Sequence, residues 1–260
     1  MTELSQVREP KFLPRKTRFV MGVDVGQIVD PTAICVIEYC EGVMDYGSDL
    51  ERHTSQTEAL GLQKGSQRWR CVYMERLPLG TKYGVIVQHV AGLLATPQLQ
   101  ADPNKNRKAS ELVIDAGGAG GVAEMFQAAG MDPICVIIRG GLDTNWKGRN
   151  RFTVAKEELI GLLDARLNHD RFPLTFSKHL VEGEAFKDEV ADFTRSTSGA
   201  GRMKYEAKQG KHDDMILAVS LAVWWLSRPK NPPAAFGRYS LRSDGRTSTL
   251  VIDPIQTTEK

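Results

Sequence analysis

Short apolar runs rich in Val and Ile, separated by polar segments, mark the first third of the chain. Two of these runs, residues 19–25 and 33–39, flank a turn signal at Asp30-Pro31 and therefore predict a β-hairpin. A third run, over residues 70–77, predicts another strand after a polar segment. We therefore expect the fold to begin with three antiparallel strands.

Beyond residue 80 the apolar positions take on helical spacing, and short strands lie between the helical segments. The expected helices cover residues 82–95, 121–130, 153–167, 180–193 and 212–225, and the expected strands cover residues 111–115, 133–138 and 173–176. The last helix is apolar on nearly all faces, which predicts that it is buried. The Gly-rich, basic segment 195–211 lies outside these elements.

Antiparallel strands followed by alternating helices and strands predict the α/β class, with a mixed five-stranded central sheet flanked by helices. The order of elements matches the ribonuclease H-like fold. Residues 1–17 are polar and basic with two prolines and predict a flexible leader, whereas residues 229–260 follow a stop at two prolines and predict a C-terminal tail. The domain itself is expected over residues 18–228.

The composition of the chain indicates a globular protein and argues against several other classes. Hydrophobic residues make up 41% of the 260 residues, which is enough for a packed core, and the net charge of +2 is too small to indicate a nucleic-acid binder by itself. No apolar run is long enough to span a bilayer and the N-terminus has no signal-like apolar segment, so we expect a cytoplasmic protein. The four cysteines are scattered, which argues against disulfides and a zinc site.

An aspartate within the first strand is the most informative single residue. Asp24 lies between Val23 and Val25, and burial of a carboxylate is costly unless a cation, a metal or several hydrogen-bond donors accompany it. Asp115 ends the fourth strand, which right-handed crossover topology places beside the first strand. Asp24 and Asp115 are therefore expected to be neighbours.

Two more carboxylates begin the last helix, at Asp213 and Asp214. Converging carboxylates repel one another unless a cation is present, and hard oxygen ligands suit Mg²⁺ or Mn²⁺. Such a cluster holds two ions about 4 Å apart in enzymes that cleave phosphodiester bonds. The structural alternatives are a helix cap for Asp213 or Asp214 and a turn residue for Asp115.

Positive charge is concentrated next to the expected acidic site. Residues 195–212 contain five Lys or Arg and one Glu, and they lead directly into the helix of Asp213. We predict phosphate contacts from this segment and from a second one over residues 145–151; the alternative is a solvated loop. The candidate DNA-binding residues are Arg202, Lys204, Lys208, Lys211, Lys147, Arg149 and Arg151.

Four stretches of the chain resemble the nuclease domain of the large terminase subunit of tailed bacteriophages. They are "GVDVGQIVDPTAICVI", "VIDAGGAGG", "RFTVAKEELIGLLDARLNHDRFPLTF" and "GKHDDMILAVSLAV", and the resemblance covers residues 18–227. It implies a ribonuclease H-like fold and a two-metal-ion endonuclease that cuts concatemeric phage DNA during genome packaging. It also implies that Asp24, Asp115 and one or both of Asp213 and Asp214 bind Mg²⁺ or Mn²⁺.

The resemblance carries expectations about partners as well. They are double-stranded DNA, a packaging ATPase domain or subunit, the small terminase subunit and the portal, in the cytoplasm of an infected bacterial host and with no membrane. One departure is that the chain has no G-x-x-x-x-G-K-[ST] loop, since "GLQKGS" has the wrong spacing. We therefore expect an excised domain or a separately encoded nuclease half.

Three alternatives remain open on sequence grounds. "GVDVG" and "DAGG" also fit an actin-like kinase or ATPase, although that fold needs two such domains and a later adenosine-binding motif. A Holliday-junction resolvase shares the acidic layout. A degenerate domain that docks on the portal would have no reason to keep costly unpaired carboxylates.

Overall fold

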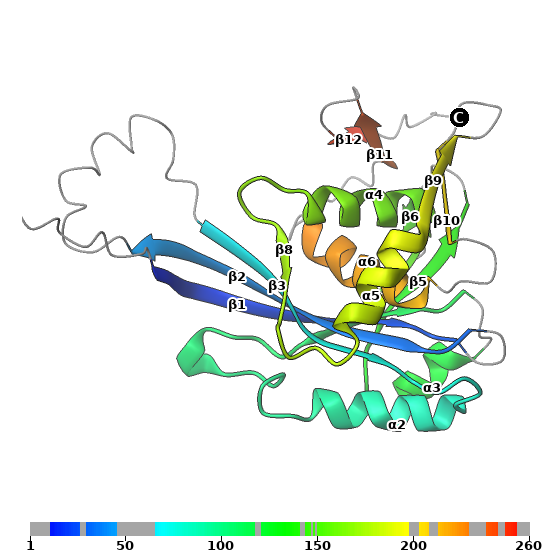
Figure 1. Ribbon diagram of the computed structural model, residues 1–260. Coiled ribbons are helices and arrows are strands. Elements are labelled where there is room, and N and C mark those ends of the chain that lie inside the picture. Colours follow the sequence, from blue (N-terminus) through cyan, green and yellow to red (C-terminus); the bar gives the residue numbers. More distant parts are fainter. Residues whose placement is uncertain are drawn as a thin grey trace, which may run out of the picture.

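A single mixed sheet with helices on both faces organises the molecule (Figure 1). The computed structural model describes residues 11–26, 30–45, 66–117, 121–140, 144–146, 148, 150–197, 203–207, 213–228, 238–243 and 248–253. The strands of the sheet are β1 (Lys11–Asp24), β2 (Ala33–Asp45), β3 (Ser66–Arg76), β4 (Glu111–Asp115), β5 (Ile134–Arg139), β6 (Asn145–Trp146), β7 (Arg151–Ala155) and β8 (Leu174–Phe176).

The spatial order of these strands is β6-β7-β5-β4-β1-β2-β3-β8. β1, β2 and β3 are antiparallel neighbours, while β1, β4 and β5 run parallel to one another. The central order β3-β2-β1-β4-β5 is the predicted ribonuclease H-like arrangement of a hairpin followed by parallel strands. The predicted strand count is wrong, because β7 and β6 extend the sheet beyond β5 and β8 extends it beyond β3.

The helices divide between the two faces of the sheet (Figure 1). α2 (Tyr83–Leu94) and α3 (Val122–Ala128) cover one face, and α4 (Lys156–Leu167), α5 (Gly183–Asp192) and α6 (Asp214–Ser227) cover the other. A short 3₁₀ helix, η2, spans Pro103–Lys105. Each face has its own apolar core, and nearly every residue of α6 is buried, as its all-round apolar surface predicts.

Several predicted boundaries differ from the structure. β1 begins at Lys11 rather than near residue 18, because residues 11–17 continue the pairing with β2, so this part of the predicted leader belongs to the sheet. The helix predicted from Thr153 begins at Lys156, because residues 151–155 form a strand that pairs with β5.

Two further hairpins lie where no regular structure was predicted. β9 (Phe193–Thr197) pairs with β10 (Met203–Ala207) in the basic segment before α6. β11 (Arg238–Ser243) pairs with β12 (Ser248–Asp253) within the predicted tail. Both segments mix glycines with polar residues. Short strands of such mixed composition show no clear alternation of apolar and polar positions.

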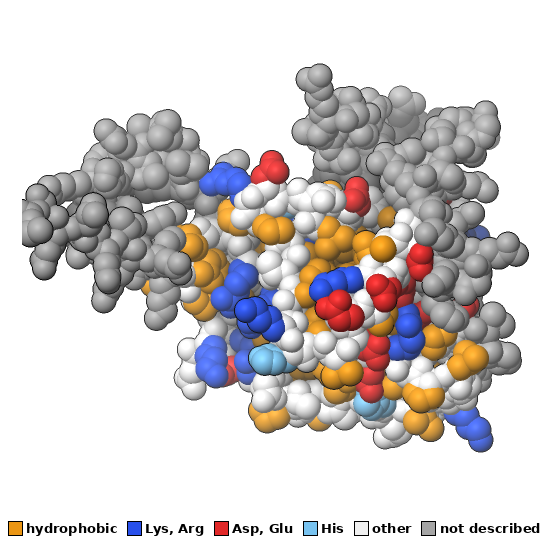
Figure 2. Space-filling view, viewed as in Figure 1, with side chains coloured by type: hydrophobic (Ala, Val, Ile, Leu, Met, Phe, Trp, Pro, Cys, Tyr) orange, Lys and Arg blue, Asp and Glu red, His pale blue; other side chains and the backbone are white. Residues whose placement is uncertain are grey.

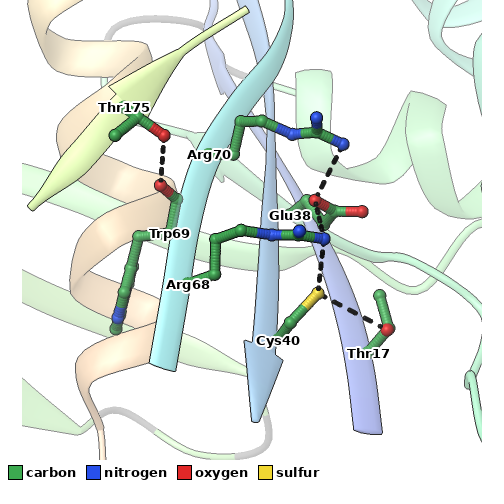
Figure 3. A network of polar contacts seen from close by, with 7 residues as sticks. All are labelled: Thr17, Glu38, Cys40, Arg68, Trp69, Arg70 and Thr175. Carbon is green, nitrogen blue, oxygen red and sulfur yellow. Dashed lines mark hydrogen bonds and ion pairs between the residues drawn. The ribbon is translucent and has the colours of Figure 1, made fainter. Parts of the chain in front are cut away.

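Ion pairs join the middle of β2 to β3 (Figure 3). Arg68 and Arg70 of β3 both reach Glu38 of β2, with Nη2 to Oε2 distances of 3.4 and 3.0 Å. The hydroxyl of Thr175 donates to the carbonyl oxygen of Trp69 at 3.0 Å, which ties β8 to β3. These contacts account for charged side chains in the middle of strands.

Two predictions about the chain as a whole can be compared with the structure. All four cysteines are buried free thiols, as their scattered positions predicted. Across the residues that the structure describes, no helix is both long and apolar enough to cross a membrane.

Candidate metal centre at the carboxyl ends of β1 and β4

Two adjacent strands place Asp24 beside Asp115. Asp24 is the last residue of β1 and Asp115 is the last residue of β4, and the parallel register pairs the preceding residues, Val23 and Ile114. Successive side chains of a strand point to opposite faces, so Asp24 shares a face with Val20 and Asp115 shares a face with Val113. Val20 and Val113 belong to the core beneath α6, and both aspartates therefore lie on the α6 side.

The start of α6 brings two more carboxylates to this edge. Asp213 occupies the N-cap position and Asp214 is the first residue of the helix. α6 lies directly on β1, since a Cβ atom at Gly22 would come within 2.1 Å of the carbonyl oxygen of Ala218. This close approach requires glycine, and it sets the position of the helix start relative to Asp24.

The charges of these groups act on Asp24. Burial raises the pKa of Asp24 well above its usual value, and the charges of Asp115, Asp214, Asp213 and Asp30 raise it further, in that order. Asp30 is exposed in the turn between β1 and β2, as its predicted turn role implies. The charges of the other three predicted site aspartates therefore all act on Asp24.

Backbone donors surround Asp115. Burial raises the pKa of Asp115, while hydrogen bonds from the backbone N–H groups of Gly117 and Ile138 oppose that rise by favouring the ionised form. The Gly117 N–H lies 2.8 Å from Oδ1. Asp115 thus also has the turn-shaping contact that its structural alternative predicts, and this contact fixes the orientation of its carboxylate.

Two cationic side chains contact the aspartates of α6. Lys156, the first residue of α4, places Nζ 2.6 Å from Oδ2 of Asp213. Arg76, the last residue of β3, places Nε 2.6 Å from Oδ2 of Asp214. These cations offset part of the negative charge at the edge of the sheet.

Arg76 also links a further buried carboxylate to the site. Its Nη2 is ion-paired with Glu189 of α5, and Oε1 of Glu189 accepts a hydrogen bond from the backbone N–H of Ile216 at 2.9 Å. Burial raises the pKa of Glu189 to about 7, and the Ile216 hydrogen bond and Arg76 oppose that rise. Burial lowers the pKa of Arg76, but its contacts with Asp214 and Glu189 outweigh this and raise it overall.

The sequence-based reasoning missed Lys156, Arg76 and Glu189. Arg76 and Asp214 are 138 residues apart, and Arg76 and Glu189 are 113 residues apart. No local spacing joins such residues, although a charged residue at the end of a strand, as at Arg76, was a signal available in the sequence.

The carboxylate oxygens of these aspartates are the kind of ligand that a divalent cation prefers. Within the ranges that the structure describes, no three His, Cys, Asp or Glu side chains are already arranged to hold a metal ion. Asp213 and Asp214 point instead to Lys156 and Arg76. The Asp24–Asp115 pair nevertheless supplies hard oxygen donors in a place where like charges and burial disfavour ionisation, and a divalent cation would relieve both effects.

Most of the predicted DNA-binding residues lie outside the described part of the chain. This holds for Arg202, Lys208, Lys211, Lys147 and Arg149. Lys204 pairs with Ser196 across the β9–β10 hairpin. Arg151 on β7 is 52% exposed and lies 3.5 Å from Glu124, so it is accessible from solvent. The DNA contacts therefore remain predictions.

The surface over β3, β8 and α5 carries both signs of charge (Figure 2). Acidic side chains gather over α5, where Glu184 is 86% exposed and pairs with Lys187. Basic side chains gather beside them in the same view. This mixture contrasts with the concentrated positive charge of residues 195–212.

Comparisons with known proteins give a structural likeness and no sequence match. No family model matches the chain, and a search of curated proteins finds no match. The large terminase nuclease of the thermophilic phage G20c with bound cobalt is similar over 84% of this chain and 88% of that chain, at 16% identity and a TM-score of 0.49.

Two further solved structures show the same kind of likeness. The large terminase nuclease domain of Thermus phage P74-26 covers 79% of this chain and 78% of that chain, with 15% identity and a TM-score of 0.46. The g2p large terminase nuclease domain of bacteriophage SPP1 with bound Mn covers 80% and 86%, with 10% identity and a TM-score of 0.40. At identities and TM-scores this low, the activity of the chain has to be inferred from its own residues.

Proposed function

We propose that the chain is a metal-dependent DNA endonuclease of the large-terminase type, which cuts concatemeric phage DNA during genome packaging. The observation that carries this proposal is that Asp24 and Asp115 end two paired parallel strands, on the face covered by α6, whose start carries Asp213 and Asp214. Carboxylates that converge in a partly buried place disfavour one another's ionised form unless a cation is present. The central strand order β3-β2-β1-β4-β5 supports the same assignment.

The proposed ligands of two Mg²⁺ or Mn²⁺ ions are Asp24, Asp115 and one or both of Asp213 and Asp214. When bound, such ions activate a water molecule and stabilise the leaving oxygen in phosphodiester cleavage. Asp115 presents its carboxylate in an orientation set by the Gly117 N–H, and Asp24 provides the oxygen donors at the centre of the group. Lys156 and Arg76 hold the two aspartates of α6 next to this edge of the sheet.

The proposed substrate is double-stranded DNA, held by the basic segment 195–212 that leads into α6. The proposed partners are a packaging ATPase domain or subunit, the small terminase subunit and the portal, in the cytoplasm of an infected bacterial host. The sequence resemblance supports these partners, and the similar solved structures bear the name of large terminase.

Incubation of supercoiled plasmid with the purified chain tests the proposal. We expect Mn²⁺-dependent nicking and linearisation with little sequence preference, and we expect EDTA to abolish it. Asp24→Asn should eliminate cleavage, whereas Asp170→Asn, at an exposed position after α4, should leave it unchanged. Intact plasmid after incubation in Mn²⁺, both alone and with an ATPase partner, would show that the assignment is wrong.

Two parallel measurements separate the alternatives. ATP hydrolysis by the chain in the absence of plasmid cleavage would favour the actin-like kinase or ATPase. Strong preference for a four-way junction over a linear duplex of the same sequence would favour a resolvase. The terminase-type nuclease is expected to show neither result.

A further inference from the structure

The N-terminus of α6, the helix that carries two of the proposed ligands, is capped by a side chain from another helix. Asp213 occupies the N-cap position of α6, where an aspartate normally accepts a hydrogen bond from the second or third backbone N–H of its own helix, but it makes no such bond. The N–H of Ile216, the third residue of α6, donates instead to Oε1 of Glu189 on α5 at 2.9 Å. Glu189 thus takes the role that Asp213 would otherwise fill.

Arg76 joins this cap to the neighbouring aspartate. Its guanidinium contacts Glu189 through Nη2 and Oδ2 of Asp214 through Nε. Both carboxylates are buried, with Asp214 only 2% and Glu189 only 8% exposed. A buried charge without a partner is costly, so the ion pairs hold Arg76 and the two carboxylates in a fixed arrangement. β3, α5 and α6 therefore meet in one fixed group of three side chains.

We infer that Glu189 and Arg76 are positioning residues of the metal centre, an inference that rests on the proposed function. Because Glu189 caps α6 from α5, the Asp213 carboxylate is not used by its own helix and reaches outward to Lys156. Because Arg76 binds both Asp214 and Glu189, the first residue of α6 is held in place against β3 and α5. Partners behind a ligand orient it and raise the affinity of a metal site.

Three variants of α5 test the inference by Mn²⁺ titration calorimetry without DNA. Glu189→Ala removes the cap and the partner of Arg76, and we expect its Mn²⁺ affinity to fall by about 10-fold or more. Glu189→Gln keeps an oxygen that accepts from Ile216, so it should restore much of the lost affinity. Glu184→Ala is the matched control, because Glu184 lies on the same helix but is 86% exposed, and it should bind Mn²⁺ as the parent does.

Amide hydrogen exchange provides a readout that involves no metal. In Glu189→Ala the N–H of Ile216 should exchange about 10-fold faster or more, while the N–H of Val223, deep in α6, should change little. Glu189→Gln should lie between the parent and Glu189→Ala. Should Glu189→Ala fail to fold, Arg76→Lys takes its place in the calorimetry, because Lys keeps the charge but cannot reach both carboxylates with a planar fork.

The outcomes separate this inference from the proposed function. Parental Mn²⁺ affinity in folded Glu189→Ala, or in Arg76→Lys where the first variant does not fold, would overturn the positioning role. Failure of the proposed function gives a different result, in which the parent and Asp24→Asn bind Mn²⁺ equally poorly. In that case unchanged exchange of the Ile216 amide in Glu189→Gln and Glu189→Ala would overturn the cap as well.

Discussion

Gly22 of β1 lies directly beneath the carbonyl oxygen of Ala218 in α6, and a Cβ atom at Gly22 would be 2.1 Å from that oxygen. We expect Gly22→Ala to push α6 away from the sheet and to destabilise the protein by about 1–3 kcal/mol, as overpacking does. Because the same helix carries Asp213 and Asp214, Mn²⁺ binding should weaken together with stability. Urea unfolding and Mn²⁺ titration measure the two effects.

Gly92→Ala is the matched control for that substitution. Gly92 lies within α2, and a Cβ atom added there would have no heavy atom of a neighbouring side chain or strand within 4 Å. Alanine favours the helix over glycine, so this variant should be more stable by about 0.5–1 kcal/mol. If the two substitutions change the midpoint of unfolding in the same direction, the close approach of α6 to β1 is not as described.

Asp24→Asn should stabilise the metal-free protein, and the gain should depend on pH. Burial and the neighbouring carboxylates raise the pKa of Asp24 in the folded state above its value of about 3.9 in the unfolded chain. The folded protein therefore binds more protons, and its stability falls as pH rises from about 4 until the folded pKa is passed. Asparagine does not titrate, so the advantage of Asp24→Asn should be small at pH 4 and larger at pH 8.

Thermal unfolding in EDTA from pH 4 to pH 8 measures that difference. Addition of Mn²⁺ should reverse the order of the two proteins, since an ion that binds only the folded state stabilises the parent and not the variant. A constant difference in melting temperature at every pH, or unfolding of Asp24→Asn, would mean that Asp24 serves as a structural hydrogen-bonding residue.

The basic segment before α6 should govern the salt dependence of DNA binding. Replacement of Arg202, Lys204, Lys208 and Lys211 by Ala removes up to four phosphate contacts, and the slope of log affinity against log salt should flatten by about three to four. Mn²⁺ affinity should barely change, and the loss should be similar for different DNA sequences. Duplex binding over a salt series in Ca²⁺ measures the slope.

Parallel slopes for that variant and the parent would identify the segment as an ordinary solvated surface. The DNA contacts would then have to come from the second basic segment. The corresponding triple variant, with Ala at Lys147, Arg149 and Arg151, would be measured in the same series.

The four cysteines should react with a thiol reagent only after unfolding. All are buried, and burial raises the pKa of the Cys35 and Cys135 thiols and raises that of Cys71 to about 12, so little thiolate is present at pH 8. We expect negligible labelling by a chromogenic disulfide within minutes in buffer and four thiols in guanidinium. Rapid labelling of the native protein would contradict the packing of the sheet.

Local patterns were sufficient to predict the central part of the fold. The β1–β2 hairpin, β4, β5, α2 and α6 follow from runs and periodicities that each element carries within itself. The crossover rule then predicted that β1 and β4 are parallel neighbours, which the pairing of Val23 with Ile114 confirms. The identity of the metal ligands and of the DNA contacts stays a prediction.

The parts that were not predicted depend on tertiary contacts. Residues 151–155 form β7 because β5 offers an edge for pairing, although their sequence runs into a helical pattern. Glu189 caps α6 across 27 residues, and Arg76 meets Asp214 across 138 residues. The charge of Arg76 at the end of a strand was visible in the sequence, but its partners become apparent only when the strands and helices are already placed.

The parallel pairing of β1 with β4 and the cover provided by α6 have a consequence for biosynthesis. Asp24 and Asp115 leave the ribosome well before Asp213 and Asp214, because α6 follows all strands of the eight-stranded sheet in the chain. Until α6 has emerged, the face of the sheet around Val20 and Val113 is not covered by this helix. A nascent chain at that stage exposes an apolar surface to which chaperones bind. The proposed metal centre therefore cannot assemble during translation until nearly the whole domain has been made.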